Sequence, residues 1–194
     1  MEIKIVKQLS YSEIYGCGLD LGTHYCDPCL DDREFGRARS GGYIKKSYLS
    51  TLLAAPTTLA TWTDGIDSGD IIMIPETSGS YDPGDPKELK GYGDRKVTYG
   101  PREMTLTLFD PNYLLNYPFF NAISRQSDLV PFFRTSSLVH IFDTVATIVA
   151  KDPVADDLES EVVWEVTNKV TSPNIPAKFP IATIASIFVC DPTT

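Results

Sequence analysis

The chain has 194 residues, 42% of them hydrophobic, and a net charge of −9. This length suits one domain, or one domain with a long extension, with enough apolar residues for a real core. The acidic net charge gives no electrostatic footprint for gripping nucleic acid, and no apolar run approaches the ~20 residues of a membrane helix. The first ten residues lack the apolar centre of a signal peptide, so we expect an intracellular protein.

The first part of the chain, residues 1–56, is irregular and glycine-rich and is expected to pack on a core formed by residues 57–194. Within it, residues 44–55 have the apolar spacing of a helix that Pro56 would end. A strand over residues 42–48 is the alternative, because Tyr43 and Ile44 follow two glycines. Residues 70–75 then predict a buried strand.

The next segment, residues 76–96, is long, polar and rich in turn residues, with an Asp-Pro-Gly-Asp-Pro sequence at its centre. A loop of this length is unusual inside a compact domain and is often functional. We predict an assembly arm, which is a hairpin or loop that becomes ordered against a neighbouring subunit. Tyr81 and Tyr92 are its large candidate anchors.

The clearest strands follow. Residues 103–109 alternate between apolar and threonine side chains, and residues 162–170 alternate with Trp164 on the apolar face, so Trp164 is expected to be buried. Two further strands are predicted at residues 138–150 and 181–189. A helix is expected after the strand at residues 103–109, with Pro118 at its first turn or at a kink. Its apolar stripe consists of Leu114, Leu115, Phe119, Ala122 and Ile123. This order predicts a mainly β fold, a sandwich or barrel with one or two short helices.

Charge is unevenly distributed along the chain. Residues 33–46 contain five basic residues and one acid, whereas residues 152–165 contain six acids and no base. One interpretation is two solvated surfaces. The other is a basic patch on one copy that meets an acidic patch on the next, in a head-to-tail contact.

The four cysteines are Cys17, Cys26, Cys29 and Cys190. Cys26 and Cys29 have the spacing of a zinc knuckle, and Cys17 and Cys190 would complete a four-thiolate structural site. Other readings are reduced, partly buried cysteines, a disulfide, and a thioredoxin-like motif, which lacks the preceding strand that such a motif requires. Apart from this structural zinc, no cofactor is expected.

No catalytic constellation emerges from the sequence. The glycine-rich stretch at residues 16–22 has the wrong spacing for a dinucleotide-binding loop. His24 lies beside the cysteines and His140 lies in a strand pattern, and no nucleophile motif accompanies either histidine. We therefore do not expect an enzyme.

From about residue 91 to residue 180, the order of features resembles the tail tube proteins of tailed bacteriophages. The resemblance is carried by the alternating strand RKVTYGPREMTLTLFD, the short helix YPFFNAIS, the later strands up to VVWEVTNKV and the turn TSPNIPAKFP. It implies a β-sandwich of tail-tube type with a flanking helix and a long loop that reaches a neighbour. Minimal tube proteins do not carry a segment like the one with the first three cysteines.

The resemblance implies a virion structural protein that self-assembles into rings or a tube, in a tail or a head-to-tail connector. Its partners would be further copies of itself and other virion proteins, with DNA as non-specific cargo in the lumen and no membrane. It would be assembled in the host cytoplasm. The alternative is a monomeric β-sandwich module that recognises carbohydrate or protein.

Overall fold

The computed structural model describes residues 37–75, 77–90, 98–153 and 162–188. All of them belong to one compact unit that begins at Phe35. Residues 40–54, expected to lie in an irregular N-terminal segment, are an integral strand and helix of this unit.

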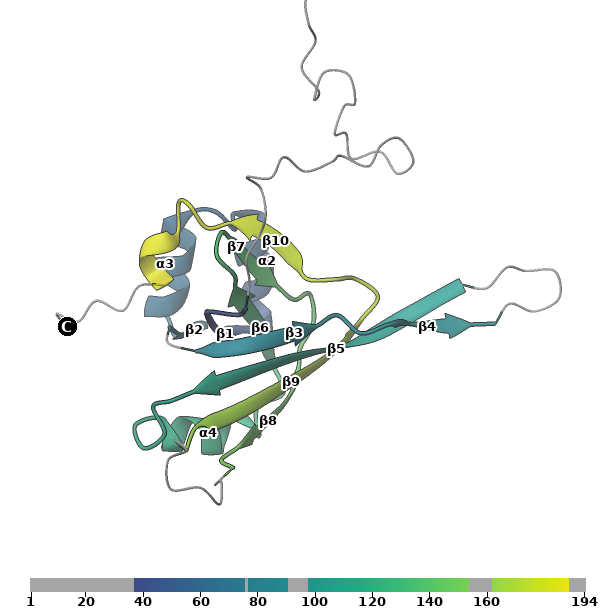
Figure 1. Ribbon diagram of the computed structural model, residues 1–194. Helices are drawn as coiled ribbons and strands as arrows, with labels where there is room; N and C mark the ends of the chain where they lie inside the picture. The colour runs from purple at the N-terminus through teal and green to yellow at the C-terminus, as the bar shows by residue number, and fades with distance from the viewer. Residues whose placement is uncertain (1–36, 76, 91–97, 154–161, 189–194) are drawn as a thin grey trace, which may run out of the picture. The chain divides into compact units, whose positions relative to one another are not determined.

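Two antiparallel sheets form the fold, as the sequence predicted (Figure 1). Sheet 1 has the strand order β10-β7-β6-β1-β2, and its strands are β1 (Ser40–Lys45), β2 (Ile71–Ile74), β6 (Leu129–Arg134), β7 (Leu138–Ile141) and β10 (Ala177–Pro180). Sheet 2 has the order β3-β5-β9-β8, with β4 added on β5, and its strands are β3 (Ser78–Asp82), β4 (Pro86–Leu89), β5 (Thr98–Asp110), β8 (Thr147–Lys151) and β9 (Trp164–Ser172).

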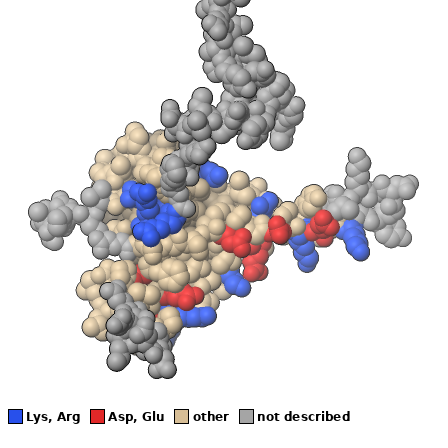
Figure 2. All heavy atoms as spheres, in the orientation of Figure 1, with Lys and Arg blue, Asp and Glu red and all other residues tan. Residues whose placement is uncertain are grey.

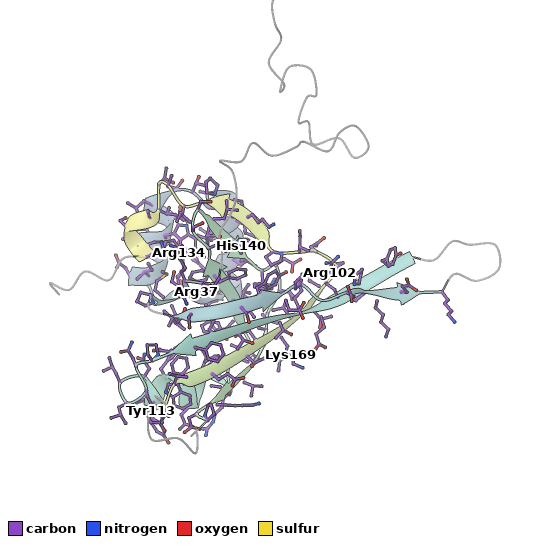
Figure 3. All side chains as sticks on the ribbon, in the orientation of Figure 1. Arg37, Arg102, Tyr113, Arg134, His140 and Lys169 are labelled. Atoms are coloured by element: carbon purple, nitrogen blue, oxygen red, sulfur yellow. The ribbon has the colours of Figure 1, made fainter. Side chains whose placement is uncertain are left out.

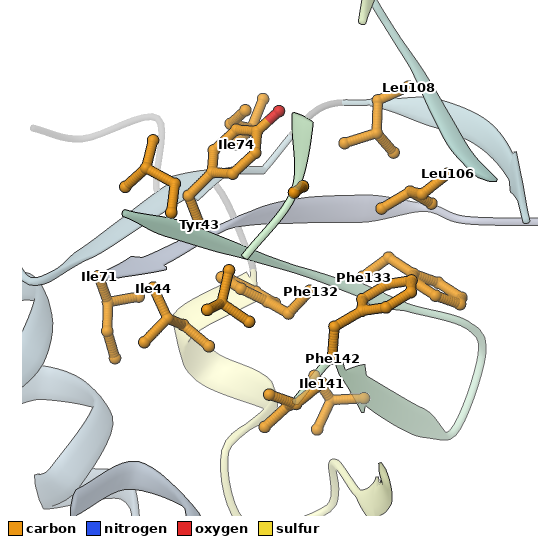
Figure 4. Close-up of a cluster of buried hydrophobic side chains, with 14 of the residues drawn as sticks. Tyr43, Ile44, Ile71, Ile74, Leu106, Leu108, Phe132, Phe133, Ile141 and Phe142 are labelled. Atoms are coloured by element: carbon orange, nitrogen blue, oxygen red, sulfur yellow. The ribbon is translucent and has the colours of Figure 1, made fainter. Parts of the chain in front are cut away.

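Alternation explains the two long central strands of sheet 2. Met104, Leu106 and Leu108 of β5 are buried, and on β9 the buried positions recur at every second residue from Trp164. These faces meet sheet 1, and Figure 4 shows part of the core between and around the strands. The predicted strands at residues 103–109 and 162–170 and the burial of Trp164 are confirmed.

Short helices cover the outer face of sheet 1. They are α2 (Lys46–Ala54), α3 (Leu59–Asp67) and the 3-10 helix η2 (Ala185–Phe188). Trp62 of α3 is fully buried there, with its ring centroid 5.3 Å from that of Phe132 and 6.0 Å from that of Phe188. The strand and the helix predicted within residues 42–55 are each confirmed in part, because β1 continues directly into α2. The helix ends before Pro56, as expected.

Two predicted strands are wrong in their extent or type. Residues 138–150 are not one strand but β7 and β8, which belong to different sheets. The connection between them turns at Asp143, whose carboxylate accepts hydrogen bonds from Ser172 and Asn174. Residues 181–189 are not a strand: among those described, turns lead into η2, and Ile181, Ile184 and Phe188 are buried at helix-like spacing.

The predicted helix begins later than its apolar stripe suggested. Helix α4 (Tyr117–Ile123) has Pro118 in its first turn, as expected, and buries Phe120 and Ile123. Leu114 and Leu115 precede the helix and are 84% and 81% exposed. Of the predicted stripe, only the residues within α4 can therefore cover the sandwich.

A buried polar pair links the two sheets. The Tyr43 hydroxyl donates to Asn168 Oδ1 at 2.9 Å, and the Asn168 amide donates to the Leu106 carbonyl at 3.1 Å. Tyr43 and Asn168 are fully buried, and burial raises the pKa of the Tyr43 phenol well above its usual range.

We expect Tyr43→Phe to lower the free energy of unfolding by about 1–3 kcal/mol, because Asn168 Oδ1 would be left buried without its donor. Urea denaturation measures the loss, with the exposed Tyr99→Phe as the control. The raised pKa of Tyr43 favours the neutral phenol in the native protein. The stability that Tyr43 contributes is therefore fully present below the ordinary tyrosine pKa. It is lost as the pH rises above that value, because the unfolded chain then releases the phenol proton more readily than the native protein. Equal stability of the two variants would show that the bond contributes nothing.

Candidate functional site

The most unusual feature of the fold is a two-stranded arm, formed by β4 and residues 98–101 of β5. Glu88 pairs with Tyr99, and Leu89 with Thr98. Strand β5 pairs with β9 only from Arg102 onward, so the arm extends beyond the sandwich as a two-stranded ribbon (Figure 1).

The arm carries apolar side chains that its own chain leaves exposed. Leu89 is 45% exposed and Tyr99 is 67% exposed. An isolated two-stranded ribbon is marginally stable in water, and contact with a further surface would stabilise it. The arm thus has the properties of a docking element.

The turn between β3 and β4, at the base of the arm, is explained by Gly84. Gly84 has a φ of +58°, a conformation that strongly favours glycine, and a Cβ at this position would lie 2.1 Å from the Glu103 carbonyl oxygen. The Gly84 N–H donates to Asp82 Oδ1 at 2.9 Å. The Asp-Pro-Gly-Asp-Pro sequence is therefore a defined turn between β3 and β4.

Residues 76–96 are thus not a single loop. Their first part is β3, an integral strand of sheet 2, and the projecting element begins only after Asp82. Tyr81 lies on the inward face: its hydroxyl contacts Met104 Sδ at 3.3 Å, and its ring lies 5.2 Å from that of Phe133. Tyr81 therefore packs within its own chain, and Tyr92 lies outside the described residues.

A second exposed apolar feature is the leucine loop, residues 111–116. Asp110 is buried, and its carboxylate accepts hydrogen bonds from the Asn112 backbone and the Asn116 side chain, both at 2.7 Å. These bonds hold a loop whose tip presents Leu114 and Leu115 to solvent. The sequence pattern placed both leucines on the apolar stripe of the predicted helix, whereas the helix begins only at Tyr117, one residue before Pro118.

Beside this loop lies an apolar groove between β2 and α4. Two hollows of about 260 and 270 Å³ share Ile72 and Phe119 in their linings. Strand β2 is the outer strand of sheet 1 and pairs only with β1, so the groove is bordered by backbone groups that no strand pairs with in the described part of the chain.

Three arginines form a basic patch next to β3. Arg37 and Arg39 precede β1, and Arg134 ends β6 opposite Ser40, with the Arg39 N–H donating to the Arg134 carbonyl at 2.9 Å. Arg37 and Arg134 lie near one another in Figure 3, and Figure 2 shows basic side chains gathered at the same place. We call Arg37, Arg39 and Arg134 the arginine patch. Arg134 is 95 positions from Arg39 in the sequence, so only strand pairing reveals it.

Arg134 is partly buried within this patch. Its guanidinium lies 5.3 Å from the centre of the Phe188 ring, and its Nε is buried without a hydrogen-bond partner. Burial lowers the pKa of the Arg134 guanidinium, and the charge of Arg39 lowers this pKa further.

A pocket of about 290 Å³ opens beside the patch, with Arg37, Tyr81, Thr135 and His140 in its lining. The His140 ring stacks on Phe133 at 4.5 Å, and His140 is buried. This placement is that of a packed histidine.

The cysteine site stays a prediction. Cys17, Cys26, Cys29 and Cys190 all lie outside the described residues, and among the residues that are described no three potential ligands converge on a metal position.

If the four cysteines bind zinc, protein purified without chelator should contain close to one zinc per chain by elemental analysis, and chelator should lower its melting temperature. Four freely titratable thiols together with a melting temperature that chelator leaves unchanged would contradict the site.

No family model, curated protein or solved structure matches this chain. Within the described ranges, none of the helices has the length and apolar character needed to cross a membrane.

Proposed function

We propose that this protein is a virion structural subunit that assembles with copies of itself into a ring or tube, in a phage tail or a head-to-tail connector that conducts DNA. The observation that carries the proposal is the arm, with Leu89 and Tyr99 exposed on a ribbon that extends beyond its own core. In a monomer, an exposed ribbon of this kind promotes aggregation, whereas in an assembly it provides a contact surface for a neighbouring subunit.

The open edges of the sheets support the same function. The outer strands are β2 and β10 in sheet 1 and β3 and β8 in sheet 2. Within the described ranges, β2 pairs only with β1 and β8 only with β9, whereas Ala38 bridges to Gly79 on the outer side of β3. Outer strands that pair on one side invite pairing with another chain, and a closed ring removes such edges. A mechanism built on strand and arm contacts needs no catalytic residue.

The outer face of sheet 2 is a second feature that bears on this function. Side chains that alternate with the buried ones point outward there, including Thr105, Thr107 and Thr167. Acidic side chains lie on the same face, among them Glu103, whose carboxylate pairs with Lys169 at 3.3 Å. A face on which polar side chains predominate, with Phe109 and Val149 as exposed apolar exceptions, suits passage of DNA that must not adhere, and the net charge of −9 favours this function as well.

Size-exclusion chromatography with light scattering, over a range of protein concentrations, tests the proposal. A self-assembling subunit gives a mass that is a multiple of 21.5 kDa and that rises with concentration. A mass of one chain at every concentration would contradict it.

The alternative is a monomeric binding module, and the groove between β2 and α4 is the observation that favours it. Its hollows approach the size of small-ligand pockets and are lined mainly by apolar side chains. The same mass measurement separates the two functions, because a module of this type would remain monomeric.

A further inference from the structure

The groove between β2 and α4 has the features of a receptor for an extended segment. Ile72 and Phe119 are partly buried and line both of its hollows, and Ala122 lines one of them. Strand β2 pairs with β1 on one side, and within the described ranges no strand pairs with its other side. An extended segment placed there can form backbone hydrogen bonds with β2 and insert its apolar side chains into the hollows.

The arm has the matching features. Strand β4 pairs with β5 alone among the described strands, so its outer edge is open to a further strand, and β4 and β2 are both four residues long. Leu89 is 45% exposed and lies over Gly100, where an added Cβ would be 3.2 Å from Leu89 Cδ1. Since Gly100 has no side chain, this face of the ribbon is thin and apolar and suits a groove.

Charge complements the apolar fit. Lys87 and Lys90 are exposed on β4 and directly after it, whereas Asp128 is exposed and lines one of the hollows. Lys45 lines the same hollow, but its ammonium group pairs with Asp70 at 3.0 Å. The lysines of the arm therefore meet a carboxylate at the groove when Leu89 enters it.

The arm of a chain cannot reach the groove of the same chain. Leu89 pairs with Thr98, the first residue of β5, whereas Asp110, the last residue of β5, lines one of the hollows. A strand of 13 residues is about 40 Å long, and Figure 1 shows the arm and α4 at its two ends. The arm that enters the groove must therefore come from a second copy.

We propose that the groove between β2 and α4 of one copy binds the arm of the next copy, with β4 added as a strand beside β2 and Leu89 in the apolar hollows. This inference rests on the proposed self-assembly and identifies the receptor for the arm. Because the arm and the groove are unlike surfaces at opposite ends of β5, the contact repeats head to tail.

Filling the groove tests the inference. Ala122 and Asn121 are both exposed on α4, but only Ala122 lines a hollow, so N121W is the matched control for A122W. In sedimentation velocity, A122W should weaken self-association at least about tenfold, because its indole occupies the space that Leu89 needs. N121W should associate like the unmodified protein, and both variants should keep its melting temperature.

A mixing experiment tests the head-to-tail contact. A protein in which an Asn-Gly turn replaces residues 87–101 keeps the groove and lacks the arm, whereas A122W keeps the arm and has a blocked groove. At a concentration at which neither protein assembles alone, light scattering of an equimolar mixture should show particles of two chains and nothing larger. The reason is that each A122W arm fills one intact groove, and no further arm and groove remain.

A charge swap gives a readout that does not depend on A122W. D128K should weaken self-association about threefold, as expected for a charge pair at the rim of a contact. K87E/K90E should also weaken it, and the variant with all three changes should regain most of the association. Absence of any recovery would contradict the contact between the arm and the groove.

The outcomes separate the inference from the proposed function. If the unmodified protein assembles and A122W assembles as well as N121W, or if the mixture stays as single chains, the inference is wrong and the proposed function stands. A monomeric unmodified protein would contradict both. If that monomer binds an apolar dye and A122W abolishes the binding, the groove is a ligand pocket instead of a receptor for the arm.

Discussion

Replacing Trp164 with alanine is expected to lower the free energy of unfolding by about 3–5 kcal/mol, as for other large buried aromatic residues. Trp164 is 4% exposed and lies within 5.5 Å of the rings of Tyr113 and Phe120, measured between centroids. Its indole N–H donates to the Tyr113 carbonyl at 3.0 Å. The substitution therefore removes packing between sheet 2, α4 and the leucine loop at once.

Chemical denaturation of W164A and of the control L114A measures this difference. Leu114 lies in the same region but is exposed, so L114A should change the stability by no more than about 0.5 kcal/mol. A W164A protein as stable as the control would mean that this aromatic cluster is not part of the core.

Removing the arm is expected to abolish assembly while leaving the fold intact. Pro86 and Arg102 are cross-strand partners, so residues 87–101 can be replaced by a two-residue Asn-Gly hairpin turn. Strands β3 and β5 keep their pairing in sheet 2, because their register begins at Asp82 and Thr105. Light scattering should then give the mass of one chain at concentrations at which the full protein is oligomeric.

The double variant L89S/Y99S is a milder test of the same idea. It keeps the length of the arm and removes its exposed apolar side chains, so association should weaken without a change in melting temperature. Unchanged assembly in the shortened protein would show that the arm has no part in it.

Alternation was sufficient to predict the two central strands of sheet 2, β5 and β9. Strands β5 and β9 pair with one another over nine residues, and each has one apolar and one polar face, so period two appears directly in their sequences. The arm was predicted in part: turn residues marked it, but β3 was hidden because Ser78, Gly79 and Ser80 give no apolar signal.

Other elements depend on contacts that sequence patterns do not contain. The run at residues 138–150 is rich in β-branched and apolar residues, and the change of sheet within it follows from Asp143, whose carboxylate accepts hydrogen bonds from Ser172 and Asn174. The last apolar run reads as a strand by composition, yet its buried positions follow the three- to four-residue spacing of a helix against Trp62.

The candidate assembly surfaces were only partly accessible from sequence for the same reason. The basic segment before β1 was evident, but Arg134 joins it through strand pairing. Tyr81 was an attractive anchor by size, and its inward position follows from its pairing with Leu106, which is buried.

Electron microscopy of the purified, negatively stained protein tests the central claim most directly. Self-assembly through the arm and the sheet edges predicts closed rings of uniform diameter, or tubes built from stacked rings, at concentrations at which light scattering reports oligomers. Isolated single-chain particles under all conditions, with neither rings nor tubes, would contradict the proposed function.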